Sequence, residues 1–128
     1  MPVKLKDKES VIFNLQGEEI EVYFRKPNAS EMVRFLGSTL SGRGPEAMEQ
    51  MLISSMELGF SCILGIREGD IVLIEDGDSK SLITDPEKPA CDKNWKEILK
   101  EKMPELFLML GNHLVRSTRA ELEVREKN

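Results

Sequence analysis

The first part of the chain alternates apolar and polar residues with the period of two that is typical of β-strands. The alternation runs over Val11–Leu15 and again over Glu19–Arg25. Gln16-Gly17 lies between these runs, and glycine suits a tight turn because it adopts positive φ without steric cost. One face of the ribbon is apolar: Val11, Phe13, Leu15, Ile20, Val22 and Phe24. The sequence therefore predicts an antiparallel β-hairpin whose apolar face packs on helices.

Two helices are predicted after the hairpin. Asn28 can cap the first helix, and Glu31 three residues later completes a capping box. Apolar residues then recur at helical spacing: Met32, Phe35, Leu36 and Leu40. The run Ser41–Pro45 breaks this pattern, and proline is favoured at the first position of a helix. An apolar stripe that broadens towards its end predicts the second helix over Pro45–Leu64.

The middle of the chain carries a short apolar run, Ile71–Ile74, that is typical of a buried strand. Two pairing partners remain open for this strand. One is Ile66, and the other is Leu82-Ile83 across the turn Asp76-Gly77-Asp78. Residues Thr84–Cys91 include two prolines, so we expect an irregular connection there rather than a linker between domains.

The last third of the chain predicts more helix. Asp92 is placed to cap a helix that contains Trp95, Ile98 and Leu99. After Pro104 an apolar helix is expected over Glu105–Val115, and the charged sequence from Arg116 predicts a solvated or frayed helical end. The elements together predict an α+β fold, with the hairpin on a small helical bundle and room for a short strand or hairpin in the middle. We expect one domain over 1–128, with ends (1–9 and 116–128) that can fray.

Composition is consistent with this organisation. A chain of 128 residues buries roughly two-thirds of its unfolded surface, which is enough for a core without metals or disulfides. No apolar run approaches the roughly 20 residues that span a bilayer. The charged start Met1–Glu9 carries no secretory signal, and Cys62 and Cys91 stand outside any paired motif. We therefore expect a cytoplasmic protein with reduced thiols and no contact with a membrane.

The net charge of −5 and the pI near 5.0 argue against nucleic acid as a partner, since phosphate binding needs clustered Lys and Arg. Most of the negative charge is local, because eight acids and four bases lie between Arg67 and Lys93. This segment is interpreted either as a solvated loop region or as an acidic docking patch.

The side chains that carry most enzymatic chemistry are scarce. His113 is the one histidine, which excludes a histidine-dependent triad and a multi-histidine metal site; we expect it to be a partly buried core or interface residue. Four residues fall where a calcium loop would place its first, third, eighth and twelfth residues: Asp76, Asp78, Ile83 and Glu87. Lys80, Ser81 and Pro86 break that loop pattern. No catalytic, cofactor-binding or metal-binding residue is predicted, and an enzyme with an unrecognised carboxylate site remains one alternative.

Methionine is the informative excess in the composition. Beyond the first residue there are six: Met32, Met48, Met51, Met56, Met103 and Met109. Because methionine is flexible and polarizable, it fills irregular cores and also suits surfaces that accept varied apolar partners. Both uses remain open for the stripe Met48, Met51 and Met56 on the second predicted helix.

The order of these elements resembles a known family. A strand-turn-strand leads into Phe24–Glu31, where a strand end, an Arg-x-Pro step and a capped helix follow one another. A middle helix comes next, followed by Trp95 with Ile98-Leu99. Pro104-Glu105-Leu106 then opens an apolar helix that has a charged tail. This layout is similar to that of the tail assembly chaperones of long-tailed bacteriophages and prophages, outside the segment Gly65–Cys91.

The resemblance implies a non-enzymatic protein of the bacterial host cytoplasm. Members of that family bind the long helical tape measure protein and keep it soluble until the tail tube polymerises around it. A minor structural tail protein, or a small regulatory interaction module of a mobile element, is the alternative in a different class.

Two helices could hold such a client: the methionine stripe of the second helix, or the apolar stripe near the C-terminus. A domain of this size needs one of them to cover the hairpin. We predict that the second helix serves the core and that the C-terminal helix is the surface for self-association or for the client. The predicted partner-binding residues are Leu106, Met109, Leu110 and Leu114.

Overall fold

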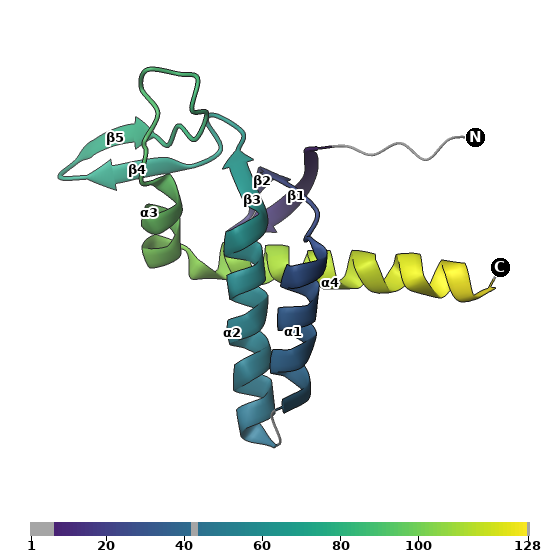
Figure 1. Ribbon diagram of the computed structural model, residues 1–128. Helices are drawn as coiled ribbons and strands as arrows, with labels where there is room; N and C mark the ends of the chain where they lie inside the picture. The colour runs from purple at the N-terminus through teal and green to yellow at the C-terminus, as the bar shows by residue number, and fades with distance from the viewer. Residues whose placement is uncertain (1–6, 42–43, 128) are drawn as a thin grey trace, which may run out of the picture. The chain divides into compact units, whose positions relative to one another are not determined.

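The computed structural model describes residues 7–41 and 44–127, with the side chains of those residues except 38–41 and 119–127. Helices and antiparallel strands are both present, which confirms the α+β class (Figure 1). The chain divides into two compact units, and each unit is built from two separate segments. The described residues within 1–26 and 63–98 form one, called the sheet unit here, and those within 27–62 and 99–128 form the other, called the helical unit. The one-domain organisation stays a prediction.

The N-terminal hairpin of the sheet unit is confirmed. Strand β1 (Glu9–Leu15) pairs antiparallel with β2 (Glu18–Phe24), with Val11 opposite Val22. Gln16 and Gly17 take positive φ angles of 55° and 80°, as a two-residue hairpin turn requires. The predicted apolar residues of β2 are buried: Ile20, Val22 and Phe24. Ile12 points to the opposite face and is 54% exposed, so the alternation gave the face correctly.

A third strand, β3 (Ile63–Ile66), pairs antiparallel with the other edge of β2. The sequence predicted helix as far as Leu64, and that boundary is wrong by two residues. A short apolar run fits a buried strand as well as it fits a helix, so periodicity could not separate the two. The backbone pairing of Ile66 with Val22 and of Gly65 with Tyr23 shows that these residues form a strand.

The middle of the chain forms a hairpin of β4 (Val72–Glu75) and β5 (Asp78–Ser81). Asp76 and Gly77 make its turn, with φ angles of 50° and 84°. Pairing across this turn was one of the two open alternatives. The strand that pairs with β4 is the polar run 78–81, which precedes the predicted partner Leu82-Ile83, because the turn has only two residues. The expectation of a buried strand is wrong, because the Ile74 side chain is 72% exposed.

An irregular segment from Leu82 to Asn94 leads to helix α3 (Trp95–Lys102). Asp92 does not cap this helix through its side chain as predicted. Its carboxylate instead accepts hydrogen bonds from Lys80 Nζ at 2.8 Å and from the Ile83 amide at 3.2 Å. Asp92 thus ties β5 and the segment that follows it to the residues just before α3.

The helical unit contains α1 (Ala29–Ser41), α2 (Pro45–Cys62), the end of α3 and α4 (Pro104–Lys127). The predicted capping box is confirmed: the Glu31 amide donates to Asn28 Oδ1 at 2.8 Å, and the Asn28 amide donates to Glu31 Oε1 at 3.0 Å. Helix α4 continues through the charged sequence after Arg116. Figure 1 shows α1 and α2 side by side and α4 crossing α2 near the C-terminal end of α2.

Candidate interaction surface

The structure reverses the predicted roles of the two apolar helices. Leu106, Leu110 and Leu114 are buried, and Met109 is half-buried. These leucines share one face of α4 with Phe107 and Gly111, whose backbones lie against α2. The prediction that this face is the open partner-binding surface is therefore wrong. An apolar stripe alone does not tell whether another helix of the same chain covers it.

Helix α2 has the exposed apolar side chains instead. Met48 is 65% exposed and Met51 is 46% exposed, so the first half of the predicted core stripe lies at the surface. Leu52 and Ile53 are exposed as well. The buried residues of α2 belong mainly to its second half: Ser54, Ser55, Leu58, Gly59 and Cys62. Helix α4 crosses only that half, and the first half of α2 extends beyond the crossing (Figure 1).

A groove opens on the helical unit between α2, the end of α3 and α4. It holds a volume of about 330 Å³ and is lined by Ile53, Met56, Glu57, Phe60, Lys100 and Phe107. The Phe60 and Phe107 rings meet edge to face at 5.4 Å between centroids. Apolar walls of this kind, with few polar groups, suit an apolar side chain or a helix stripe rather than a charged substrate.

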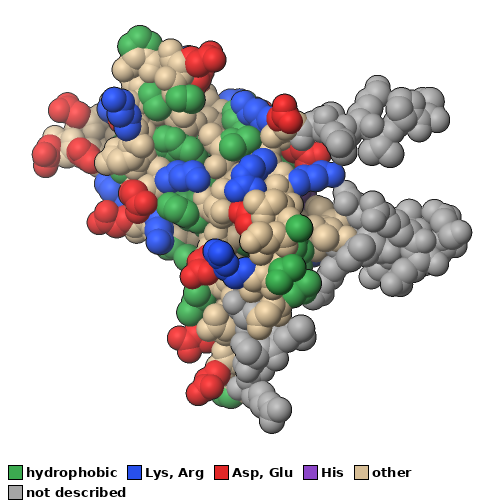
Figure 2. Space-filling view, viewed as in Figure 1, with side chains coloured by type: hydrophobic (Ala, Val, Ile, Leu, Met, Phe, Trp, Pro, Cys, Tyr) green, Lys and Arg blue, Asp and Glu red, His purple; other side chains and the backbone are tan. Residues whose placement is uncertain are grey.

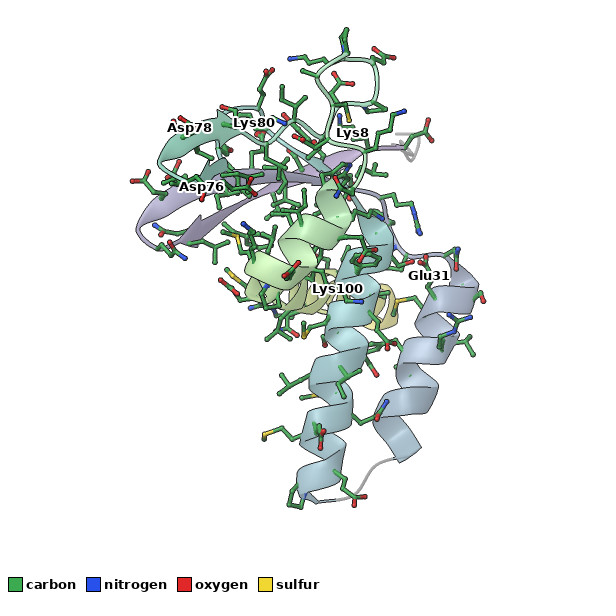
Figure 3. The ribbon with its side chains drawn as sticks, turned by 90° about the vertical axis from the view of Figure 1, so that its left-hand side faces the viewer. Lys8, Glu31, Asp76, Asp78, Lys80 and Lys100 are labelled. Carbon is green, nitrogen blue, oxygen red and sulfur yellow. The ribbon has the colours of Figure 1, made fainter. Side chains whose placement is uncertain are left out.

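One cation borders this groove. Lys100 Nζ lies 5.0 Å from the centroid of the Phe60 ring, within the range of a cation–π contact. Figure 3 shows Lys100 beside α2. The aliphatic stem of a lysine can line an apolar wall while its ammonium group stays in water. Lys100 therefore adds to the groove wall without making the floor polar.

The outer face of α2 is acidic as well as apolar. The helix contains Glu46, Glu49 and Glu57, and no Lys or Arg occurs in its sequence. Glu46 and Glu57 are separated from Ile53 by seven and four residues, spacings that place them on one face of a helix. In Figure 2 acidic side chains lie beside hydrophobic ones over the lower end of the view, where Figure 1 places α2. The apolar surface around Ile53 thus has a negative border.

A second, much smaller hollow of about 60 Å³ lies between α1 and α2. Glu31 accepts a hydrogen bond from the Ser61 hydroxyl at its edge. The buried Ser54 hydroxyl lines the hollow and has no hydrogen-bond partner among the described residues. A space of this size accommodates water molecules but not an organic substrate.

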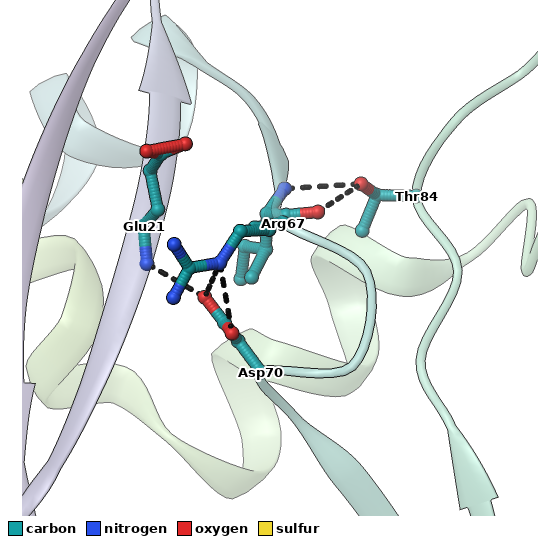
Figure 4. Close-up of polar contacts among 5 residues, drawn as sticks. Glu21, Arg67, Asp70 and Thr84 are labelled. Carbon is teal, nitrogen blue, oxygen red and sulfur yellow. Dashed lines mark hydrogen bonds and ion pairs between the residues drawn. The ribbon is translucent and has the colours of Figure 1, made fainter.

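The acids of segment 67–93 are partly structural. Asp70 accepts a hydrogen bond from the Glu21 amide at 2.8 Å and bonds with Arg67 Nε at 3.0 Å (Figure 4). In the same region Thr84 is buried, accepts from the Ile66 amide and donates to the Ile66 carbonyl. Asp70 and Thr84 therefore hold the strand ends together, and they are not available to a partner.

Ion pairs account for further charges of that segment. Lys88 pairs with Glu68, and this hydrogen bond raises the pKa of Lys88. The hydrogen bond with Asp92 likewise raises the pKa of Lys80. Asp76, Asp78 and Lys80 lie on the β4–β5 hairpin (Figure 3), so the residues that would begin a calcium loop are a hairpin turn and a strand.

The histidine, the two cysteines and the possible metal ligands were the other candidates from the sequence. His113 is half-buried on α4, in line with the expectation for it. Cys62 is buried, Cys91 is half-buried, and both are free thiols. Among the residues that the structure describes, no group of His, Cys, Asp and Glu side chains has the arrangement of a metal site.

The groove itself was missed by the sequence analysis. Phe60 and Phe107 were assigned only to apolar stripes, and Ile53 and Lys100 were not singled out. The i, i+3 and i+7 spacing of Ile53, Met56 and Phe60 was visible, but the identity of the neighbouring helix was not.

Within 7–41 and 44–127, no helix is both long enough and apolar enough to cross a membrane. No protein-family model matches this chain, and no curated protein or solved structure is significantly similar to it.

Proposed function

We propose that this chain is a non-enzymatic tail assembly chaperone of a long-tailed bacteriophage or prophage. In this proposal it acts in the bacterial host cytoplasm, where it binds the tape measure protein and keeps it soluble during tail assembly. The proposal combines the layout resemblance described above with the apolar surface of the helical unit.

The observation that carries the proposal is the exposed strip on α2. Met48 and Leu52 are exposed there at the i, i+4 spacing that continues to Met56 and Phe60 of the groove, and Met51 and Ile53 are exposed on other sides of the helix. Large apolar side chains gathered on one exposed helix are a common mark of a protein-binding surface. Methionine adapts to differently shaped partners, as a chaperone with a long and varied client requires.

The binding mode that fits this surface is a helix in a groove. An amphipathic helix buries residues at i, i+3, i+4 and i+7, and the half-buried Phe60 ring, backed by the buried Phe107, lines the groove for such anchors. Affinity per copy need only be modest, because several copies can cover a long client and each must be released when the tail tube forms.

The proposal predicts a very long open reading frame, rich in helix-forming residues, just downstream of the gene, and co-expression with that reading frame tests it. The wild-type chain is expected to keep that product in the soluble fraction and to be pulled down with it. The double variant Ile53→Ser, Met56→Ser is expected to lose both effects while keeping its circular dichroism spectrum.

A matched control is available on α1. Val33 and Leu36 are also exposed and apolar but do not line the groove, so Val33→Ser, Leu36→Ser should leave client binding unchanged. Client solubility that is insensitive to the groove variant would contradict the proposal. A partner that stays bound in finished tails would instead indicate a structural tail protein, and a partner that is no tail protein would indicate a regulatory module.

A further inference from the structure

The charge around the groove restricts what can occupy it. Glu46, Glu49 and Glu57 lie on α2 and are exposed, whereas Lys100 is the cation that lines the groove. Glu57 is itself a lining residue, and Glu49 is separated from Ile53 by four residues and from Met56 by seven. A helix that fills the groove and continues along α2 towards the N-terminal end of α2 therefore meets all three carboxylates.

A partner helix with acidic flanks would be repelled by this border. Like charges brought together across an interface are unfavourable, whereas complementary charges favour one partner over another and speed association. The apolar walls of the groove can bind any apolar stripe by hydrophobic contact. The glutamates favour partner helices whose flanking residues are positively charged over those whose flanking residues are negatively charged.

From this surface we infer that the occupant is an amphipathic helix whose apolar stripe is flanked by Lys and Arg. The inference rests on the proposed function, which it deepens by naming the chemistry of the client segment. The stripe fills the groove beside Ile53, Met56 and Phe60, and the basic flanks pair with Glu46, Glu49 and Glu57.

Two synthetic peptides of 18 residues, the length of α2, test this inference. Both carry Leu at the same i, i+3, i+4 and i+7 positions, and all other positions are Lys in one peptide and Glu in the other. Fluorescence anisotropy of the labelled peptides with the full chain is expected to show binding of the Leu/Lys peptide and much weaker binding of the Leu/Glu peptide.

Two triple variants separate local charge from overall charge. Glu46→Gln, Glu49→Gln, Glu57→Gln removes the border of the groove, and we expect Leu/Lys binding to weaken about tenfold, the sum of three surface ion pairs. Glu18→Gln, Glu19→Gln, Glu87→Gln removes the same charge from exposed positions of the sheet unit. This control should bind like the wild type to within about twofold.

The groove variant Ile53→Ser, Met56→Ser distinguishes the possible failures. If the Leu/Glu peptide binds as tightly as the Leu/Lys peptide, or the two triple variants weaken binding equally, the inference is overturned while the proposed function stands. If neither peptide responds to the groove variant, the groove holds no helix and the proposed function fails as well. A dimer that occludes the groove in the absence of peptide, and that the groove variant dissociates, would place a second copy there and also overturn the inference.

Discussion

Gly111 of α4 lies directly against the backbone of Ser55 of α2. A Cβ atom at position 111 would overlap the Ser55 carbonyl, at 2.6 Å from its carbon. The contact is reciprocal, because a Cβ atom at Gly59 would stand 3.0 Å from the Phe107 carbonyl carbon. Each helix thus presents two contact positions four residues apart, so the backbones themselves form the crossing that buries the leucine face of α4.

Adding a methyl group at this crossing should be costly. Gly59→Ala and Gly111→Ala force the helices apart, and we expect each to lower the free energy of unfolding by about 1–3 kcal/mol or more. Gly37→Ala in α1 is the control, since nothing lies within 4 Å of a Cβ there. It should stabilise the chain by up to about 1 kcal/mol through helix propensity. Urea denaturation of the three variants measures the difference, and equal effects would show that α2 and α4 do not cross closely.

The reversed roles of α2 and α4 give a second prediction. Leu110 is fully buried, so Leu110→Ala should cost about 2–5 kcal/mol. Met48→Ser and Met51→Ser remove exposed side chains, and each should change stability by no more than about 0.5 kcal/mol. Thermal or urea unfolding compares them directly. A stable Leu110→Ala protein alongside an unfolded Met48→Ser protein would restore the assignment made from sequence.

The local elements were predictable where a few adjacent residues decide the structure. Gln16-Gly17 makes the hairpin turn, Asn28 and Glu31 make the capping box, and Pro45 begins α2, as expected. In each case the interactions lie within a few residues of one another, so their sequence pattern is sufficient.

The candidate site was not predictable in the same way. Leu110 is buried and Met48 is exposed because the second half of α2 packs against α4 through small residues. That contact joins residues far apart in the sequence. Ser55 and Gly59 are small residues of the second predicted helix, but the sequence pattern does not identify their partner on α4. The missed strand β3 has the same origin, since Ile63–Ile66 becomes a strand only because β2 offers an edge.

The two faces of the N-terminal hairpin should respond oppositely to charge. Phe24→Asp buries an unpaired carboxylate at a position that is 4% exposed, which should prevent folding. Ile12→Asp places the same group on the exposed face of β1 and should be tolerated with a change of about 1 kcal/mol or less. Circular dichroism and thermal melting compare the two variants. Cooperative melting of Phe24→Asp at the wild-type temperature would mean that this face is not part of the core.

The carboxylate of Asp92 should make stability depend on pH at the acid end. The hydrogen bond from Lys80, and then that from the Ile83 amide, hold the pKa of Asp92 below its ordinary value of 3.8. A group whose pKa is lowered on folding stabilises the fold above its unfolded pKa, and this contribution is lost as the pH falls through the folded value. Asp92→Asn should therefore be less stable than the wild type at pH 7, and the difference should shrink as the pH falls below about 4.

Urea unfolding of both proteins at several pH values between about 2 and 7 measures this difference in stability, with Glu87→Gln at an exposed position as the control. A stability difference that is constant over this range would show that the loss comes from the changed amide and not from the charge. No difference at any pH would mean that Asp92 does not hold β5 to the segment before α3.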